Sequence, residues 1–109
     1  MTTGEQLAVL TLARVFAVQP KAASLLLALY AAPRPVTAPA LRRQVDTTDC
    51  ALRSHLSHIR AAVGGIVTSE DPLAYRLSPT ARAEITGALA EMYAEVEAFL
   101  RPMVGRVAA

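Results

Sequence analysis

The sequence has no tryptophan, a single cysteine and few other aromatic residues. Aromatic residues make up 5% of the chain and apolar residues 53%, so its core has to be built mainly from Leu, Val and Ala, a composition that favours helices. The single cysteine, Cys50, cannot form an internal disulfide, which fits a reducing compartment. No apolar run approaches the ~20 residues of a membrane-spanning helix, and the N-terminus lacks the pattern of a secretory signal. We therefore expect a cytoplasmic protein that does not bind a membrane.

The length of 109 residues allows one domain, 1–109, but not two. An apolar fraction this high in a small chain predicts that part of its apolar surface is covered by a second subunit. The sequence also lacks a glycine-rich phosphate loop, a pair of carboxylates in an apolar setting and a nucleophile elbow. We therefore assign no catalytic residue and do not expect an enzyme.

The net charge is only +2, but the charges are distributed unevenly. Residues 34–60 contain five arginines and two aspartates, whereas residues 84–97 contain four glutamates and no basic residue. Arginine outnumbers lysine ten to one, which a genome rich in G and C would also produce, so only the placement of the arginines is informative. The basic middle of the chain predicts one face for a polyanion.

The N-terminal region 5–32 predicts two helices, over residues 5–18 and 20–32. The first is apolar on almost every side, which is typical of a helix buried over most of its surface. In so short a chain the expected cover is a second copy. The second helix begins at Pro20, ends at the PRP sequence and supplies the centre of the core. From the first helix we assign these residues to a dimer interface: Leu7, Leu10 and Phe16.

The most informative region is 36–77. Within 36–63, the sequence predicts a short helix capped by Thr37, a polar DTTD turn, and a second helix of about four turns, 49–63, capped by Thr48 or Asp49. IVTS and AYRL predict the two strands of a hairpin within 64–77, after a Gly-Gly stop. This order is the pattern of a helix-turn-helix that reads a DNA groove, followed by a wing.

Ser78-Pro79 predicts the start of a long C-terminal helix, 78–104. Its apolar residues recur at alternating spacings of four and three, which is a heptad pattern. The pattern is longer than the core of a small domain needs, so we favour self-association over a helix that only covers its own domain. Pro102 interrupts the pattern, and the tail after it is expected to fray. From this helix the dimer interface takes Leu89, Met92, Val96 and Phe99.

On a helical wheel, residues 49–63 have an inward stripe of apolar residues and a small, polar outward face that can approach base edges. His55 lies on a shoulder nearer the core. The residues assigned to base contacts are Arg53, Ser54, Ser57 and His58. The residues assigned to contacts with the DNA backbone are Arg42, Arg43, Thr48, Arg60 and Arg76.

The run from Pro20 to Leu100 resembles winged-helix transcriptional regulators. YRLSPTARAEI (Tyr75 to Ile85) is most similar to the MarR type, in which the second wing strand passes through a Leu-Ser/Thr step into a long dimerisation helix. LRSHLSHIRAAV before a hairpin ending in YRL also resembles the effector domain of OmpR/PhoB-type response regulators. The leading helix and the lack of an N-terminal β-sheet argue against that second kinship. The resemblance implies that helix 49–63 enters the major groove and that the terminal helices form a two-fold dimer.

Two features differ from the family pattern. The predicted wing tip is Glu70-Asp71-Pro72, where the family usually has basic residues, and an acidic tip is repelled by phosphate. The turn of the helix-turn-helix also lacks the usual glycine. Both leave open an alternative function, a winged helix that binds protein as an interaction module or adaptor subunit.

A metal site at Cys50, His55 and His58 is disfavoured. The two histidines can share a helix face, but Cys50 lies far from His58 along the helix and no fourth ligand is near, so we expect no metal and no cofactor. An idle thiol is also favoured over a redox sensor at Cys50. Taken together, the sequence predicts a mainly α protein with a small β-hairpin: a winged helix-turn-helix domain whose N- and C-terminal helices form a homodimer interface. The predicted function is sequence-specific regulation of transcription by binding double-stranded DNA.

Overall fold

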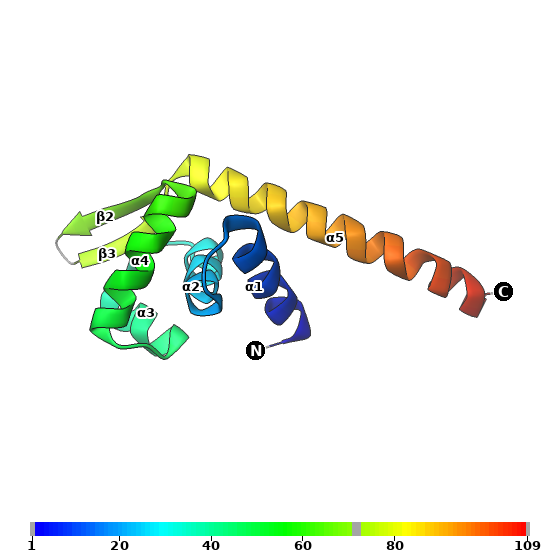
Figure 1. Ribbon diagram of the computed structural model, residues 1–109, viewed down its shortest axis with the longest axis horizontal. Helices are drawn as coiled ribbons and strands as arrows, with labels where there is room; N and C mark the ends of the chain where they lie inside the picture. Colours follow the sequence, from blue (N-terminus) through cyan, green and yellow to red (C-terminus); the bar gives the residue numbers. More distant parts are fainter. Residues whose placement is uncertain (1, 71–72, 109) are drawn as a thin grey trace.

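A computed structural model describes the backbone of residues 2–70 and 73–108, and the side chains of residues 2–69 and 73–102. The predicted mainly α fold with a small β element is confirmed, since the described residues form five helices and three short strands (Figure 1). Along the chain these are α1 (Thr3–Phe16), α2 (Pro20–Ala31), β1 (Val36–Thr37), α3 (Ala38–Val45), α4 (Asp49–Val63), β2 (Ile66–Glu70), β3 (Leu73–Leu77) and α5 (Pro79–Ala108). In the predicted acidic tip, Asp71, Pro72 and the Glu70 side chain lie outside the described residues.

The three strands form an antiparallel sheet in the order β1-β3-β2. The first strand was not predicted from the sequence. Thr37 caps α3 as expected, because its hydroxyl accepts a hydrogen bond from the Ala40 amide at 3.4 Å. A residue that caps a helix has extended dihedral angles, however, and this lets Val36 and Thr37 pair with Tyr75 and Ala74. The pairing ties the start of α3 to the hairpin of β2 and β3.

Helix α2 lies at the centre of the core, in contact with α1, α3, α4 and β3. The inward stripe predicted for α4 is confirmed, because its four apolar residues are all buried. Leucine dominates the packing, and Tyr75 on β3 is an aromatic residue buried among the core side chains. The largest fully buried side chains are Leu12, Leu25, Leu26, Leu29, Leu41, Leu52, Ile59 and Ile85.

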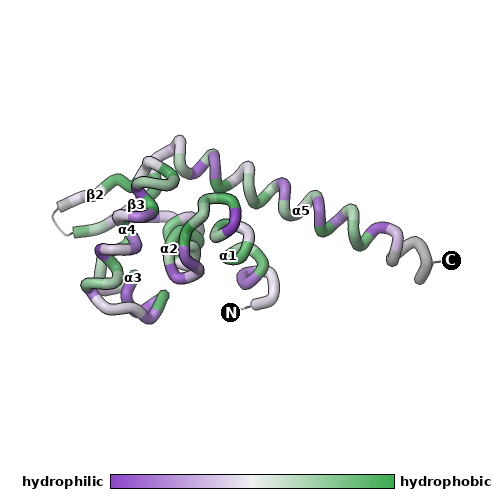
Figure 2. The backbone as a smooth tube through the Cα atoms, in the orientation of Figure 1, coloured by the Kyte–Doolittle hydropathy of each residue, from purple (hydrophilic) through white to green (hydrophobic). Residues whose placement is uncertain are grey.

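Helix α5 packs along α1 with its first half and then extends beyond the rest of the chain (Figure 1). The described chain is accordingly elongated, measuring 59 × 26 × 24 Å. Hydrophobic and hydrophilic residues alternate along the projecting half (Figure 2). The expected fraying after Pro102 is not seen, since α5 runs through this proline to Ala108. A proline removes one backbone hydrogen bond of a helix, but its fixed φ is itself helical.

The turn between α3 and α4 needs no glycine. Asp46 ends α3 in the left-handed region, with φ 54° and ψ 67°. Aspartate adopts this conformation more readily than most other non-glycine residues, because its short polar side chain can bond locally. Thus Asp46 takes the backbone conformation that glycine usually provides, and the missing glycine is no obstacle to the turn.

Within the described residues, no single helix combines the length and apolar character needed to cross a membrane. Helices α1 and α2 meet these criteria only as a pair, and that pair is bent by 111° at its break.

Candidate nucleic-acid interface

Helix α4 is positioned by caps at both ends and by the apolar side chains of its inner face. Thr48 caps its N-terminus, as predicted, since its hydroxyl accepts a hydrogen bond from the Ala51 amide at 3.2 Å. Gly64 ends the helix in the left-handed conformation. Thr48 is exposed and can still donate its hydroxyl proton to a phosphate, so the cap is compatible with its assigned role.

The outer face of α4 carries the residues assigned to base contacts. Arg53, Ser54, Ser57 and His58 are all exposed, and the side chain of Arg53 is 77% accessible. Small serines beside a long arginine leave space for a base edge to approach the helix. The structure therefore brings these four residues together on one open surface, and their contact with DNA stays a prediction.

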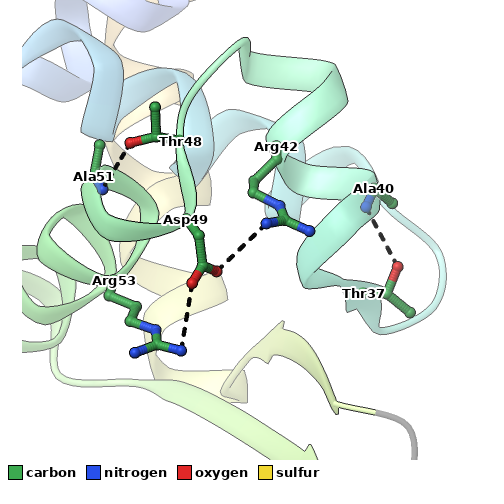
Figure 3. Close-up of polar contacts among 7 residues, drawn as sticks. All are labelled: Thr37, Ala40, Arg42, Thr48, Asp49, Ala51 and Arg53. Carbon is green, nitrogen blue, oxygen red and sulfur yellow. Dashed lines mark hydrogen bonds and ion pairs between the residues drawn. The ribbon is translucent and has the colours of Figure 1, made fainter.

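The carboxylate of Asp49 joins α3 to α4 (Figure 3). One oxygen, Oδ1, lies 3.6 Å from Nη1 of Arg42 on α3, and the other, Oδ2, lies 3.4 Å from Nη2 of Arg53 on α4. Neither ion pair was predicted from the sequence. The spacing of four residues between Asp49 and Arg53 was a usable signal for one of them. The pair with Arg42 depends on the packing of two helices and has no signal in the sequence.

Arg60 contacts the hairpin. Its Nη2 atom donates a hydrogen bond to the Thr68 hydroxyl on β2 at 2.7 Å. This bond holds the hairpin beside α4 and leaves the other donors of the exposed guanidinium available, so the assignment of Arg60 to a phosphate stays a prediction. Arg43 and Arg76, also assigned to phosphates, are exposed and have no ion pair within residues 2–69 and 73–102. These two remain available to an external anion.

His55 lies half-buried on the inner shoulder of α4, as predicted. Burial lowers the pKa of His55 below its usual value, and the positive charges of His58 and Lys21 lower it further. Its Nδ1 atom is buried and has no hydrogen-bond partner among the described side chains and backbone. The neutral imidazole is therefore the form that the folded chain favours.

The pKa of His55 predicts a loss of stability in acid. A histidine in the unfolded chain has a pKa of about 6.5. Because the pKa of His55 is lower in the folded chain, the unfolded state takes up the proton first as the pH falls. The free energy of unfolding should therefore decrease as the pH falls from 7 towards 5, and the contribution is fully present above the unfolded pKa. His55→Gln should flatten this part of the pH profile, as measured by urea unfolding. Equal slopes for the variant and the wild type would contradict this role of His55.

A polar cluster that was not predicted from the sequence holds helix α5 against α2. Arg82 donates hydrogen bonds to the carbonyl oxygens of Tyr30 at 2.9 Å and Leu29 at 3.4 Å, which lie at the C-terminus of α2. Its guanidinium carbon lies 5.2 Å from the centre of the Tyr30 ring. The Tyr30 hydroxyl pairs with that of Thr86 at 2.8 Å. The cluster satisfies carbonyls that a helix end leaves unpaired and fixes α5 against the core.

The residues assigned to a dimer interface fall into three groups by burial. Leu89 and Met92 are 8% and 5% exposed, because they lie on the half of α5 that packs within the chain. Their assignment is therefore corrected to the core of the subunit. Leu7, Leu10 and Phe99 are exposed, the last at 72%, whereas Phe16 and Val96 are half-buried. Further exposed apolar side chains on these helices, not among those assigned, are Val15, Tyr93 and Leu100.

Cys50 is exposed and forms no disulfide. The described part of the chain holds no group of three or more His, Cys, Asp or Glu side chains arranged to bind a metal ion. Comparisons of the chain with protein-family models, with curated proteins and with solved structures gave no match.

Proposed function

We propose that the protein is a winged-helix regulator of transcription in the cytoplasm that binds double-stranded DNA as a homodimer, as its resemblance to the MarR type implies. The observation that carries the proposal is the outer face of α4, where Arg53, Ser54, Ser57 and His58 are exposed together, opposite the buried apolar stripe of the helix. The order of α3, a tight turn, α4 and a hairpin is that of a winged helix-turn-helix. In this arrangement α4 enters the major groove and reads base edges.

The arginines around α4 divide into two roles. Arg43 and Arg76 are free to bind phosphates, which positions the protein on the duplex without selecting a sequence. Arg53 lies on the outer face of α4 and can bind a guanine through O6 and N7. The β2–β3 hairpin, fastened to α4 by Arg60, would lie beside the same groove.

The dimer would form through the exposed apolar surface of α1 and α5. This surface is defined by Leu7 and Leu10 on α1 and by Tyr93, Phe99 and Leu100 on α5, the helix that projects from the rest of the chain (Figure 1). Apolar side chains on a projecting helix are stabilised when a second subunit covers them. A two-fold pair would place its two α4 helices in successive major grooves, about 34 Å apart.

Two arginine variants test the proposed DNA face. Arg53→Ala should reduce the preference among duplex sequences, since a bidentate contact to guanine is worth roughly 1–3 kcal/mol. Arg43→Ala should weaken binding to every sequence alike and lower the salt slope by about 1 for each phosphate that the variant no longer binds. Fluorescence anisotropy with several duplexes measures both quantities.

The matched control for these variants is Arg101→Ala, because Arg101 lies on α5 and pairs with Glu97 at 2.8 Å. This variant should bind all duplexes as the wild type does. Equal losses on every sequence for Arg53→Ala and Arg43→Ala would contradict the two roles.

The alternative is an interaction module or adaptor subunit that binds protein. One observation favours it, because Asp49 partly neutralises Arg42 and Arg53 and so weakens the positive charge of the α4 face. If the wild type fails to bind any duplex at low salt, this alternative replaces the first proposal.

A further inference from the structure

The Asp49 carboxylate lies between two arginines at the first turn of α4, whereas Asp46, the other acidic residue of this surface, lies in the preceding turn. The Asp49 side chain is half exposed, and its two oxygens face guanidinium groups from two different helices (Figure 3). An exposed ion pair of this kind contributes about 0–1 kcal/mol to stability. As the first residue of α4, Asp49 also stabilises the helix, because its negative charge interacts favourably with the helix dipole. Neither effect requires that one carboxylate be shared by Arg42 and Arg53.

The shared carboxylate changes what Arg53 can bind. Nη2 of Arg53 faces Asp49, whereas the side chain has no other ion pair or hydrogen bond within the described residues. A guanidinium has five N–H donors in a planar fork, so pairing with Asp49 restricts the orientation of that plane and leaves donors for one more partner. The O6 and N7 atoms of guanine accept two parallel hydrogen bonds from such a fork.

The negative charge of Asp49 also discriminates between possible partners of Arg53. A phosphate would approach the carboxylate and be repelled, and the repulsion increases where the groove excludes water. A base edge carries no net charge, and cytosine offers an amino group that a carboxylate can accept from. The pair Asp49–Arg53 therefore suits a G·C base pair better than the DNA backbone.

We propose that Asp49 determines the sequence specificity of the α4 face by orienting Arg53 towards a guanine and by disfavouring phosphate binding there. The inference rests on the proposed DNA-binding function and adds the residue that makes Arg53 bind a guanine in preference to a phosphate. Asp49 thus acts as a positioning residue, through Arg53.

The test compares Asp49→Asn with Asp46→Asn. Both variants remove one negative charge, and Asp46 lies three residues away in the α3–α4 turn, with no ion pair among the described residues. Asparagine tolerates the left-handed backbone of Asp46, so this control should fold. The wild type and both variants would be used separately to select duplexes from a random-sequence pool, and the selected pools sequenced.

We expect the wild type and Asp46→Asn to enrich the same guanine in each half-site. For Asp49→Asn, the preference for guanine at that position should fall roughly ten-fold, and the affinity for unselected duplex should rise. Arg53→Lys, which keeps the charge but not the planar fork, should lose the same preference. Enrichment of the same guanine by Asp49→Asn would overturn the role of Asp49 and leave the proposed function intact. If the wild type retains no duplex at low salt, the proposed function fails, and this inference with it.

Discussion

Phe99→Glu is expected to convert the proposed dimer into a monomer. The Phe99 side chain is 72% exposed on the projecting half of α5, so a charge there leaves the core of the subunit intact but would be buried without a partner in a dimer. The mass measured by sedimentation equilibrium should fall from twice the chain mass to 11.6 kDa. Affinity for a duplex with two half-sites should fall by roughly a hundred-fold or more, because the second half-site is no longer bound intramolecularly.

A matched control introduces the same charge elsewhere on α5. Ala83 is exposed on the half of the helix that lies over the core, and Ala83→Glu should leave both the mass and the affinity unchanged. A wild type that sediments as a monomer at micromolar concentration would contradict the proposed interface. A dimer that survives Phe99→Glu would show that other surfaces hold the two chains together.

Of the substitutions proposed, Gly65→Ala is expected to lower the free energy of unfolding the most. A Cβ atom at Gly65 would overlap the Ser78 hydroxyl and lie 3.0 Å from the Cβ of Ala81. Ser78 cannot move freely, because its hydroxyl accepts a hydrogen bond from the Ala81 amide at 3.1 Å and its amide donates to the Gly65 carbonyl at 2.6 Å. The free energy of unfolding in urea should fall by about 2–4 kcal/mol.

Gly87→Ala provides the opposite control. Gly87 lies inside α5, and a Cβ atom there would meet nothing within 4 Å, so alanine should stabilise the helix by about 1 kcal/mol. A Gly65→Ala variant as stable as the wild type would mean that the backbone at Gly65 can move away from Ser78 at little cost.

The sequence predicted the helices well because their ends are marked by residues with a local physical role. Thr48 supplies a capping oxygen, and Pro20 fits a first helical turn. The apolar period of α4 likewise predicted which face lies inward, and therefore which residues lie outward together. These features depend on neighbours within a few residues, so they can be identified without knowledge of the tertiary fold.

The features that were not predicted from the sequence depend on contacts between segments that are far apart along the chain. The pairing of β1 with β3 joins Val36 to Tyr75, and the cluster of Arg82 with Tyr30 joins residues 52 positions apart. The heptad pattern of α5 could not distinguish Met92, which packs inside the subunit, from Phe99, which is exposed. Both residues satisfy the same period, and only the position of α1 decides which of them is covered.

The most direct test of the proposed DNA-binding function is the anisotropy of a fluorescent random-sequence duplex over a range of salt concentrations. If α4, Arg43 and Arg76 form a cationic DNA face, affinity should fall steeply with salt. If Arg43 and Arg76 of each subunit bind one phosphate apiece, the slope of log K against log salt should be about −3.6 or steeper for a dimer. No binding at the lowest salt, or binding that is insensitive to salt, would contradict the proposal and direct the search to protein partners.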